Sequence, residues 1–378
     1  MSIRIGFLYL YHEYHVYHSA PIAFELSRLD PDLEVILLSA TDHSTDLLAK
    51  LSSHYPGHGC RIQPLSQPWT FRYLNIELRR FPPPRAVVKR HAVLLQEMDV
   101  LVGTNHPVAT TLQQAGITMP KLIMAFHGAG DRAYGFKQRL EQFDLLLLSG
   151  PKKYHRLEGS GILHKGNWAI VGYPKFDVVS VDANIAEQLF PEPKSIILYN
   201  PHFRRHLSSW YGWGREILDF FLHSSRYNLI FAPHVELKGR KQRWLSLRKY
   251  RSHPHIHVDL GSPASLDMTY PRIADIYLGD VSSQIGEFLL KPRPCVFLNS
   301  HHISWENNPD YLHWELGPVI DTPAQLADAL EEAVERHDHY RARQIQYFKD
   351  SFDQTEESSS LRAARAIHSF LVENYPSR

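Results

Sequence analysis

The feature that most constrains the fold is an alternation of short apolar runs with helical segments, which occurs twice along the 378 residues. Before a proline-containing segment at 172–194, the predicted strands are 3–9, 33–38, 61–65, 99–103, 121–126, 144–148 and 168–171. After that segment they are 195–199, 228–232, 256–259, 276–278 and 295–298. Because such alternation is typical of parallel sheets covered on both faces, the sequence predicts an α/β fold of two doubly wound, Rossmann-like domains.

The proline-containing segment also divides the chain. We predict a first domain at 1–180, a second at 181–340 and a helical tail at 341–378, with packing of the tail on the first domain left open. In doubly wound folds, ligands bind beyond the carboxyl ends of the strands. Two such domains are therefore expected to face a central cleft.

Charge and cysteine content exclude several classes of protein. The 41 basic and 40 acidic side chains nearly cancel, so we expect no nucleic-acid partner. Two cysteines cannot form a disulfide framework, which favours a reducing cytoplasm. The chain starts directly with a predicted strand, and no apolar run approaches the roughly 18 residues of a spanning helix. We therefore expect neither a signal peptide nor a membrane span.

The stretch 270–299 carries the most specific local signal. A predicted strand is broken at Asp280, and Ser282 or Ser283 can cap a helix that runs to Leu290. Unpaired N–H groups at a helix N-terminus, with two hydroxyls beside them, favour an anion such as a diphosphate. An ordinary strand–cap–helix junction has the same pattern, and the local sequence alone does not separate the two.

Several predicted strands end in polar side chains of the kind that bind or transfer charged groups. These are His127, Arg204, Arg205, His234, Asp280, Ser282 and Ser283. One histidine in such a place is typical of packing. Several polar groups at corresponding strand ends in two domains favour a ligand site.

A series of motifs in a fixed order carries a family resemblance. They are FHG at 126–128, VGYPKFD at 171–177, LYNPHFR at 198–204, DVSS at 280–283 with Glu287 and KP at 291–292, and LGPV at 316–319. Together they resemble the CDP-glycerol glycerophosphotransferases, the teichoic-acid polymerase and primase family, which has a GT-B fold. The resemblance covers about 122–330 and weakens in the first hundred residues.

The resemblance implies a transferase that moves glycerol phosphate, or a related polyol phosphate, from a CDP-activated donor to an acceptor hydroxyl in cell-wall or capsule polymer synthesis. It assigns the acceptor side to the first domain and the nucleotide donor to the second. The acceptor would be a polyol phosphate, a glycan or a lipid-linked molecule. No cofactor is implied, because the activated donor is itself a substrate.

The chain departs from the family pattern near both expected head groups. The family's WHGTPLK is replaced by FHGAGDR at 126–132, so that Arg132 or Lys137 would have to supply the missing positive charge. The family's HP becomes His234 followed by Val235, and the tyrosine before its serine pair becomes Val281. Glycerol phosphate is therefore an expectation from resemblance alone.

The residue types support phosphate transfer. His127 is the candidate base, because an unperturbed imidazole titrates near pH ~6.5 and can accept a proton at neutrality. His234, Ser282 and Ser283 would stabilise the negative charge of the diphosphate, and Arg204 or Arg205 would add a charge-assisted contact.

Two acidic residues near this site have alternative interpretations. Asp280 could orient a histidine or cap the turn, and we favour capping. Glu287 and Lys291 are four residues apart on the predicted helix, so an exposed ion pair is slightly favoured over a contact to the nucleotide ribose.

The sequence contains little that suggests a metal site. The D-x-D at 30–32 lies between a helix and a strand and is predicted to be a turn. His12, His15 and His18 lack an accompanying Cys or carboxylate cluster, so we expect acceptor-side or surface groups rather than metal ligands. Neither a phosphate loop nor a G-x-G-x-x-G after the first strand occurs.

Membrane contact and the reaction class remain open. Basic residues with aromatics occur at 79–90 and 238–251, where a solvated basic face is slightly favoured over peripheral binding at the inner face of the cytoplasmic membrane. The rival functions are a nucleotide-sugar glycosyltransferase or epimerase of GT-B fold, and a non-catalytic nucleotide-binding protein.

Overall fold

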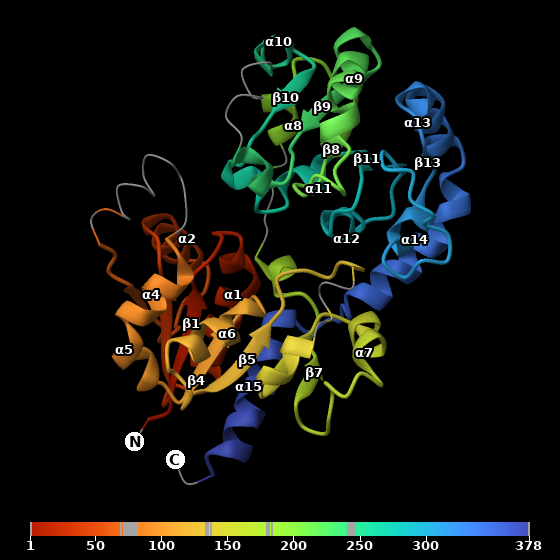
Figure 1. The fold of residues 1–378 in the computed structure, drawn as a ribbon. Coiled ribbons are helices and arrows are strands. Elements are labelled where there is room, and N and C mark those ends of the chain that lie inside the picture. Colours follow the sequence, from red (N-terminus) through yellow and green to blue (C-terminus); the bar gives the residue numbers. More distant parts are fainter. Residues whose placement is uncertain are drawn as a thin grey trace. The chain divides into compact units, whose positions relative to one another are not determined.

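The chain folds into two units, each built around its own sheet (Figure 1). The computed structural model describes residues 2–68, 70, 82–132, 136, 138–178, 182, 184–239 and 247–376. The first unit comprises Met1–Ala129, Phe136–Val178 and Lys349–Arg378, and the second comprises Gly130–Gly135 and Val179–Phe348.

The first unit contains a seven-stranded parallel sheet in the order β3-β2-β1-β4-β5-β6-β7. Its strands are β1 (Arg4–Tyr9), β2 (Glu34–Ser39), β3 (Arg61–Pro64), β4 (Val100–Gly103), β5 (Lys121–Ala125), β6 (Leu145–Leu148) and β7 (Trp168–Ile170). The chain order reverses between β1 and β4. In doubly wound sheets such a switch point opens a crevice at the carboxyl ends of the strands.

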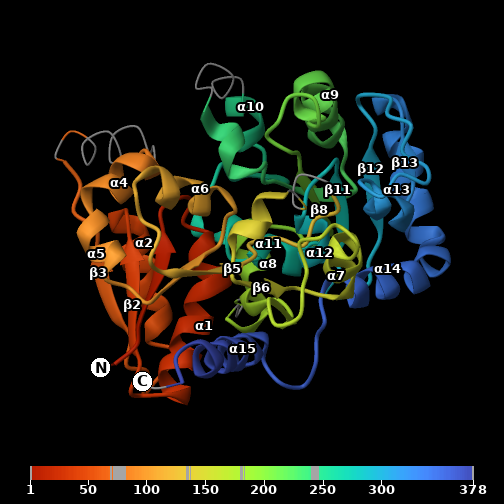
Figure 2. The same ribbon diagram turned by 60° about the horizontal axis from the view of Figure 1, so that its bottom comes forward.

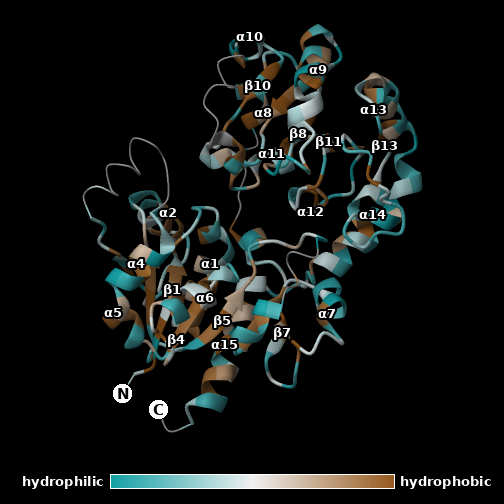
Figure 3. Cartoon of the chain, in the orientation of Figure 1, coloured by the Kyte–Doolittle hydropathy of each residue, from teal (hydrophilic) through white to brown (hydrophobic). Residues whose placement is uncertain are grey.

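Helices cover both faces of this sheet, as the apolar strands require. They are α1 (His15–Leu29), α2 (Asp42–Ser52), α4 (Pro84–Arg90), α5 (Ala92–Gln96), α6 (Pro107–Gln114), α7 (Pro151–Leu157) and α15 (Ser359–Asn374), with short 3₁₀ turns η2 (Gln138–Gln142) and η3 (Pro174–Asp177). Buried side chains such as Leu8, Leu101 and Leu146 pack against Val88 and Leu112 from the helices. In Figure 3 the central strands of this sheet are coloured largely as hydrophobic.

The C-terminal helix α15 belongs to the first unit and packs against α1 (Figure 2). The hydroxyl of Ser359 accepts a hydrogen bond of 2.9 Å from the backbone N–H of Tyr173. Gly172, which precedes Tyr173, has a φ of +84°, and a Cβ at Gly172 would lie 2.3 Å from the Ser359 hydroxyl oxygen. Glycine is therefore required at this position. Helix α14 (His337–Ser351) precedes α15 and crosses the boundary between the two units at 348–349.

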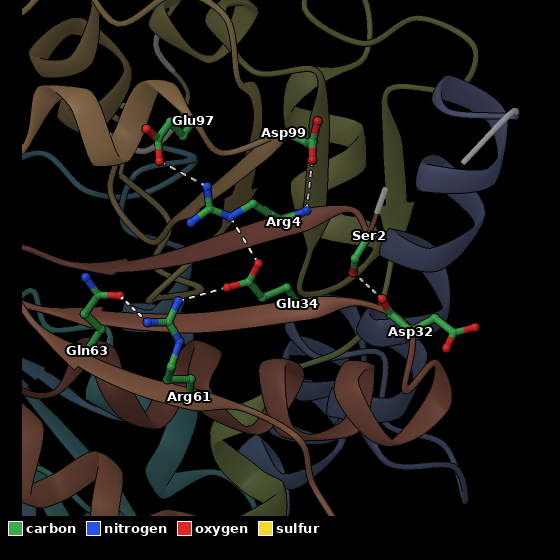
Figure 4. A network of polar contacts seen from close by, with 8 residues as sticks. All are labelled: Ser2, Arg4, Asp32, Glu34, Arg61, Gln63, Glu97 and Asp99. Atoms are coloured by element: carbon green, nitrogen blue, oxygen red, sulfur yellow. Dashed lines mark hydrogen bonds and ion pairs between the residues drawn. The ribbon is translucent and has the colours of Figure 1, made fainter.

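Charged side chains tie together the amino ends of β1, β2 and β3, the end opposite the expected site (Figure 4). Arg4 contacts Glu34 at 3.1 Å and Glu97 at 3.2 Å, and Arg61 contacts Glu34 at 2.9 Å. The backbone N–H of Arg4 donates to Asp99 at 2.9 Å. These pairs are partly exposed, so each contributes little to the stability of the fold. They lie at the amino ends of the strands, away from the carboxyl ends where a ligand is expected.

The second unit contains a six-stranded parallel sheet in the order β10-β9-β8-β11-β12-β13. Its strands are β8 (Ser195–Asn200), β9 (Tyr227–Phe231), β10 (Ile256–Val258), β11 (Ile276–Gly279), β12 (Cys295–Leu298) and β13 (Val319–Ile320). Its helices are α8 (Ile185–Leu189), α9 (Trp210–His223), α10 (Arg248–Arg251), α11 (Thr269–Ile273), α12 (Gln284–Phe288) and α13 (Leu326–Glu335), with 3₁₀ turns η4 (Val235–Gly239), η7 (Pro263–Ser265), η8 (Leu312–Leu316) and η9 (Pro323–Gln325). The switch point lies between β8 and β11.

The predicted α/β fold of two doubly wound domains is confirmed. Every predicted strand is present, and β13, which has only two residues, was not predicted. Helix α1 begins at His15, three residues before the predicted start. None of the helices in the described part of the chain is both long and apolar enough to cross a bilayer.

Candidate active site

The switch point of the first unit brings three segments together. Helix α1 starts at His15, shortly after β1 ends, Thr104 directly follows β4, and His127 lies two residues beyond β5. Because β1, β4 and β5 are neighbours in a parallel sheet, these residues lie at the same edge. The sheet order therefore gathers residues that are about one hundred positions apart in sequence.

His127, the predicted base, is held in one orientation by backbone. Its Nδ1 donates a hydrogen bond of 2.5 Å to the carbonyl of Thr104. A carbonyl oxygen can only accept, so Nδ1 carries the proton and Nε2 carries the lone pair. The side chain is partly buried. This tautomer is the one that a general base acting through Nε2 needs.

Two further histidines surround His127. The ring of His15 stacks on it with centroids 4.4 Å apart and planes inclined by 19°, and His18 lies edge-on at 6.3 Å. The hydroxyl of Thr104 is hydrogen-bonded to Nδ1 of His15 at 2.7 Å. Thr104 thus holds both stacked rings, one through its carbonyl and the other through its side chain.

Burial keeps these neighbouring imidazoles uncharged. His15 and His18 are 1% and 2% exposed, and this desolvation lowers the pKa of both well below the ordinary value. The nearby His127 lowers the pKa of His15 further, and the buried Lys175 does the same for the pKa of His18. Among the described residues, neither His15 Nε2 nor His18 Nδ1 has a hydrogen-bond partner. For His15 and His18 the surface interpretation is therefore wrong.

Lys153 supports the loop that carries His127. Its ammonium donates a hydrogen bond of 2.8 Å to the carbonyl of Gly128 and lies 4.2 Å from the centroid of the Phe126 ring. The side chain is buried. Sequence reasoning did not single out Lys153 or Thr104, since neither belongs to a recognisable motif.

The switch point of the second unit is organised by Asp280. Its carboxylate accepts hydrogen bonds from the backbone N–H groups of His202 at 2.8 Å, Ser209 at 2.7 Å and Val281 at 2.7 Å. The Ser209 hydroxyl adds a fourth at 2.9 Å. Burial raises the pKa of Asp280, and these hydrogen bonds act in the opposite direction. The contacts correspond to the capping alternative, because the Asp280 carboxylate binds backbone N–H groups and a serine hydroxyl rather than a histidine ring.

A polar and aromatic cluster extends from β8 and β9. His202 stacks on Phe203 with centroids 4.5 Å apart, and His234 lies 4.6 Å from Phe203 and 5.9 Å from His202. Burial, followed by the nearby His234 and Arg204, lowers the pKa of His202 to about 2. The structure thus groups the predicted His234 and Arg204 around His202, which was not predicted as a site residue. Arg205 is exposed and lies 5.8 Å from the centroid of the Tyr211 ring.

The serine pair follows β11 as predicted, but the helix is short. Helix α12 ends at Phe288 rather than Leu290. Ser282 is buried, and its hydroxyl accepts a hydrogen bond of 3.3 Å from the N–H of Gln284. Ser283 is exposed, and a Cβ built on Gly130 would lie 3.4 Å from its Cβ. Of the two serines, Ser283 is therefore the one presented to solvent.

The prediction of an exposed ion pair between Glu287 and Lys291 is wrong. Glu287 is 5% exposed, and α12 ends before Lys291 is reached. Glu287 instead lies on the buried side of α12. The two side chains do not form an exposed pair on one helix.

Arg132 and Lys137 are the two cations expected to replace the positive charge of the family lysine. Arg132 belongs to the second unit and lowers the pKa of His202 by its positive charge, after burial, His234 and Arg204. Within the described residues its buried Nη1 has no hydrogen-bond partner. Lys137 lies outside the described residues.

The candidate metal motif is a turn, as predicted. The N–H of Asp32 donates to the Asp30 carboxylate at 3.0 Å, which closes an Asx turn. In the described parts of the chain, no group of three or more His, Cys, Asp or Glu side chains is placed to hold a metal ion.

A family model matches most of the chain. The model for CDP-glycerol:poly(glycerophosphate) glycerophosphotransferases matches residues 91–369. The chain belongs to this family. It is a glycerophosphotransferase-like enzyme, and the match extends beyond both ends of the segment 122–330 on which the resemblance rested. No curated protein sequence matches the chain.

Solved structures show the same fold. The wall teichoic acid polymerase TagF, in a form soaked with CDPG, has 16% identity and a TM-score of 0.63, with 98% of this chain and 89% of that chain covered. The Methanocaldococcus jannaschii UDP-GlcNAc 2-epimerase, in complex with UDP-GlcNAc and UDP, has 14% identity and a TM-score of 0.62, with 98% and 100% covered. These likenesses establish the GT-B fold.

Proposed function

We propose that this glycerophosphotransferase family member transfers glycerol phosphate, or a related polyol phosphate, from its CDP-activated donor with His127 as the general base. One observation carries the assignment of the base. The hydrogen bond from His127 Nδ1 to the Thr104 carbonyl leaves the ring lone pair on Nε2. Because Thr104 itself belongs to the switch-point edge, this orientation is built into the sheet.

The proposed step is a single displacement at phosphorus. The acceptor hydroxyl oxygen attacks the phosphorus that carries the glycerol, and His127 Nε2 accepts the hydroxyl proton. The bond from that phosphorus to the oxygen of CMP breaks, and a phosphodiester forms as CMP leaves. General-base assistance of this kind contributes typically about 10²–10⁴-fold to the rate.

The donor diphosphate is proposed to bind in the second unit beside Ser283, Ser282, His234 and Arg204. A hydroxyl, an imidazole and a guanidinium offer charge-assisted hydrogen bonds to phosphate oxygens. Asp280 contributes by holding the backbone of both Val281 and His202.

Three other charged residues differ in how well they suit this role. Arg132 is a further candidate for binding phosphate, because its positive charge acts on His202. Arg205 is less well placed, since its guanidinium lies over the Tyr211 ring. Glu287 is less well placed because it is buried.

The acceptor is proposed to be lipid-linked and presented at an anionic membrane, at the inner face of the cytoplasmic membrane. The basic residues of α4, namely Arg85, Lys89 and Arg90, are exposed. Val93 on α5 is 76% exposed and borders a hollow of about 360 Å³ that Ala115 and Ile117 also line. Basic side chains close in sequence to the exposed Val93 suit the surface of an anionic bilayer. The predicted residues Arg79, Arg80 and Phe81, and residues 240–246 of the second basic segment, lie outside the described residues.

The test is product release with different activated donors. We expect CMP to form from CDP-glycerol in the presence of a lipid-linked polyol-phosphate acceptor in anionic vesicles, and no UDP to form from UDP-sugars. Release of UDP, or epimerisation of a UDP-sugar, would identify the rival nucleotide-sugar chemistry. Donor binding with no release of either nucleotide would support the non-catalytic alternative.

A further inference from the structure

Asp131 and His313 form a buried, hydrogen-bonded pair in the second unit. The Asp131 side chain is 0% exposed and the His313 side chain 4% exposed, and the carboxylate lies 2.9 Å from His313 Nδ1. The backbone N–H of His313 donates to the same carboxylate at 3.2 Å. The Tyr347 hydroxyl, from α14, donates to it at 3.1 Å. No motif in the sequence pointed to this pair.

The other side of the His313 ring meets the donor turn. His313 Nε2 lies 3.2 Å from the backbone carbonyl of Asp280, and Nε1 of Trp314 donates to the same carbonyl at 2.9 Å. A carbonyl only accepts, so Nε2 carries a proton, and Nδ1 shares a proton with Asp131. The imidazole of His313 therefore bridges the buried Asp131 carboxylate and the backbone carbonyl of Asp280, the residue just before Val281 and the serine pair.

Asp280 is held through both its backbone and its side chain. Its carbonyl accepts from His313 and Trp314, while its carboxylate accepts from His202, Ser209 and Val281. The serine pair begins two positions further along the chain. Any rotation of the 279–280 or 280–281 peptide would move the serines and would break hydrogen bonds in a buried, low-dielectric setting, where they are strong.

We propose that Asp131 and His313 are positioning residues that hold the turn 280–283 in the geometry that binds the donor diphosphate. This inference rests on the proposed function, because the turn is the proposed phosphate site. Asp131 receives its own position from Tyr347 and the His313 backbone, so the support reaches the turn from three separate segments. Outer residues of this kind, which orient the groups that touch a ligand, often affect affinity as strongly as direct contacts.

A matched pair of substitutions separates positioning from packing. In His313→Gln the amide nitrogen can reach the place of Nε2 and keep the hydrogen bond to the Asp280 carbonyl. In His313→Asn the shorter side chain can keep only the contact to Asp131. Both variants lose the ring, so a role limited to packing would affect them alike. Tyr347→Phe is a milder third variant, which removes only one hydroxyl.

The experiment measures CDP affinity by calorimetry and thermal unfolding on the same samples of the full chain. We expect His313→Asn to weaken CDP binding about tenfold, by analogy with the lower end of the effects seen for outer-shell partners of metal ligands. His313→Gln keeps the hydrogen bond to the Asp280 carbonyl and loses the contact to Asp131, so it should weaken binding by clearly less than His313→Asn, and Tyr347→Phe should also weaken binding by less than His313→Asn. Asp219→Asn is the control, since Asp219 also accepts from a tyrosine, Tyr250 at 2.7 Å, but far along the chain from the turn. It should leave CDP affinity unchanged.

Two results would overturn the inference alone. One is unchanged CDP affinity in His313→Asn, and the other is an equal loss in His313→Asn and His313→Gln that tracks their unfolding temperatures. If His313→Asn fails to fold, unchanged affinity in Tyr347→Phe decides against the inference. Absence of CDP binding by the unchanged protein would overturn the proposed function together with it, so the two failures are distinguishable.

Discussion

The imidazole of His127 stacks on that of His15, with centroids 4.4 Å apart and an angle of 19° between the planes. Thr104 fixes both rings, the first through its carbonyl and the second through its hydroxyl. The carbonyl of Thr104 can only accept a hydrogen bond, so the arrangement places the proton of His127 on Nδ1 and leaves Nε2 as the atom that can accept one.

Replacement of His127 by Ala is expected to lower turnover by about 10²–10⁴-fold, because the acceptor hydroxyl loses its base. CDP affinity should change little, because the diphosphate is proposed to bind in the second unit. Steady-state CMP release and CDP calorimetry measure the two quantities. His155→Ala is the control, as its side chain is 68% exposed and should affect neither. Near-normal turnover in His127→Ala would remove the residue from the mechanism.

The stability of the protein is expected to fall as the pH drops below about 6.5. His15 and His18 have lowered pKa values in the folded protein, so between the folded values and about 6.5 the unfolded chain binds more protons. Their contribution is complete above about pH 6.5 and is lost as the pH falls towards the folded values. Each group adds a slope of up to about 1.4 kcal/mol per pH unit.

Chemical unfolding of His15→Phe and His18→Phe between pH 5 and 8 tests this expectation. Each variant should show a shallower dependence of the unfolding free energy on pH than the unchanged protein. The exposed His155, substituted by Phe, provides the comparison and should leave the dependence as it was. A pH profile that is identical in all four proteins would contradict burial of His15 and His18 as neutral rings.

Removal of both hydroxyls, in Ser282→Ala/Ser283→Ala, is expected to weaken CDP binding by about 1–3 kcal/mol, the usual cost of losing hydrogen bonds to a charged group. Because Ser283 is exposed and Ser282 is buried, Ser283→Ala alone should account for most of this loss. Calorimetry with CDP measures the affinities. Unchanged affinity in the double variant would show that the serines only shape the start of α12.

The basic helix α4 is expected to bind anionic vesicles. Each Lys or Arg near an anionic surface contributes about 1 kcal/mol, so Arg85→Gln/Lys89→Gln/Arg90→Gln should abolish most sedimentation with phosphatidylglycerol vesicles at low salt. Arg341→Gln/Arg343→Gln/Lys349→Gln, which removes three exposed cations of α14, is the matched control and should sediment like the unchanged protein. Binding should decrease as salt rises. Equal sedimentation of both variants would place the membrane contact elsewhere or exclude it.

Gly172→Ala is expected to destabilise the first unit by about 1–3 kcal/mol. The reason is that Gly172 has a φ of +84° and that no room exists for a Cβ next to Ser359. Gly212→Ala in α9 is the matched control. A Cβ there meets nothing within 4 Å, so the substitution should stabilise by roughly 0.4–1 kcal/mol. Thermal unfolding measures both. A neutral Gly172→Ala would mean that α15 can shift away from η3 at little cost.

The sequence by itself determined the strands and the positions where they end. Runs such as Leu145–Leu148 have apolar side chains on both faces, and such runs alternating with helical segments are typical of a parallel sheet covered on both faces. Since parallel strands end at one edge, the apolar runs alone were enough to put His127, His234 and the serine pair at strand ends. The motif order then indicated the family.

Only the tertiary structure decided which of these ends are neighbours and what is buried. The placement of β4 beside β1 depends on packing across the whole sheet, and it is this pairing that brings Thr104 and His15 to His127. Glu287 lies on the buried side of α12, and the helix ends at Phe288, before Lys291 is reached.

The pairing of Asp131 with His313 shows why contacts of this kind could not be predicted from the sequence. These residues are 182 positions apart, and no local pattern encodes a contact at that separation. Periodicity and turn chemistry are local properties, which a sequence displays directly. Strand order, burial and long-range pairing result from the packing of the complete chain.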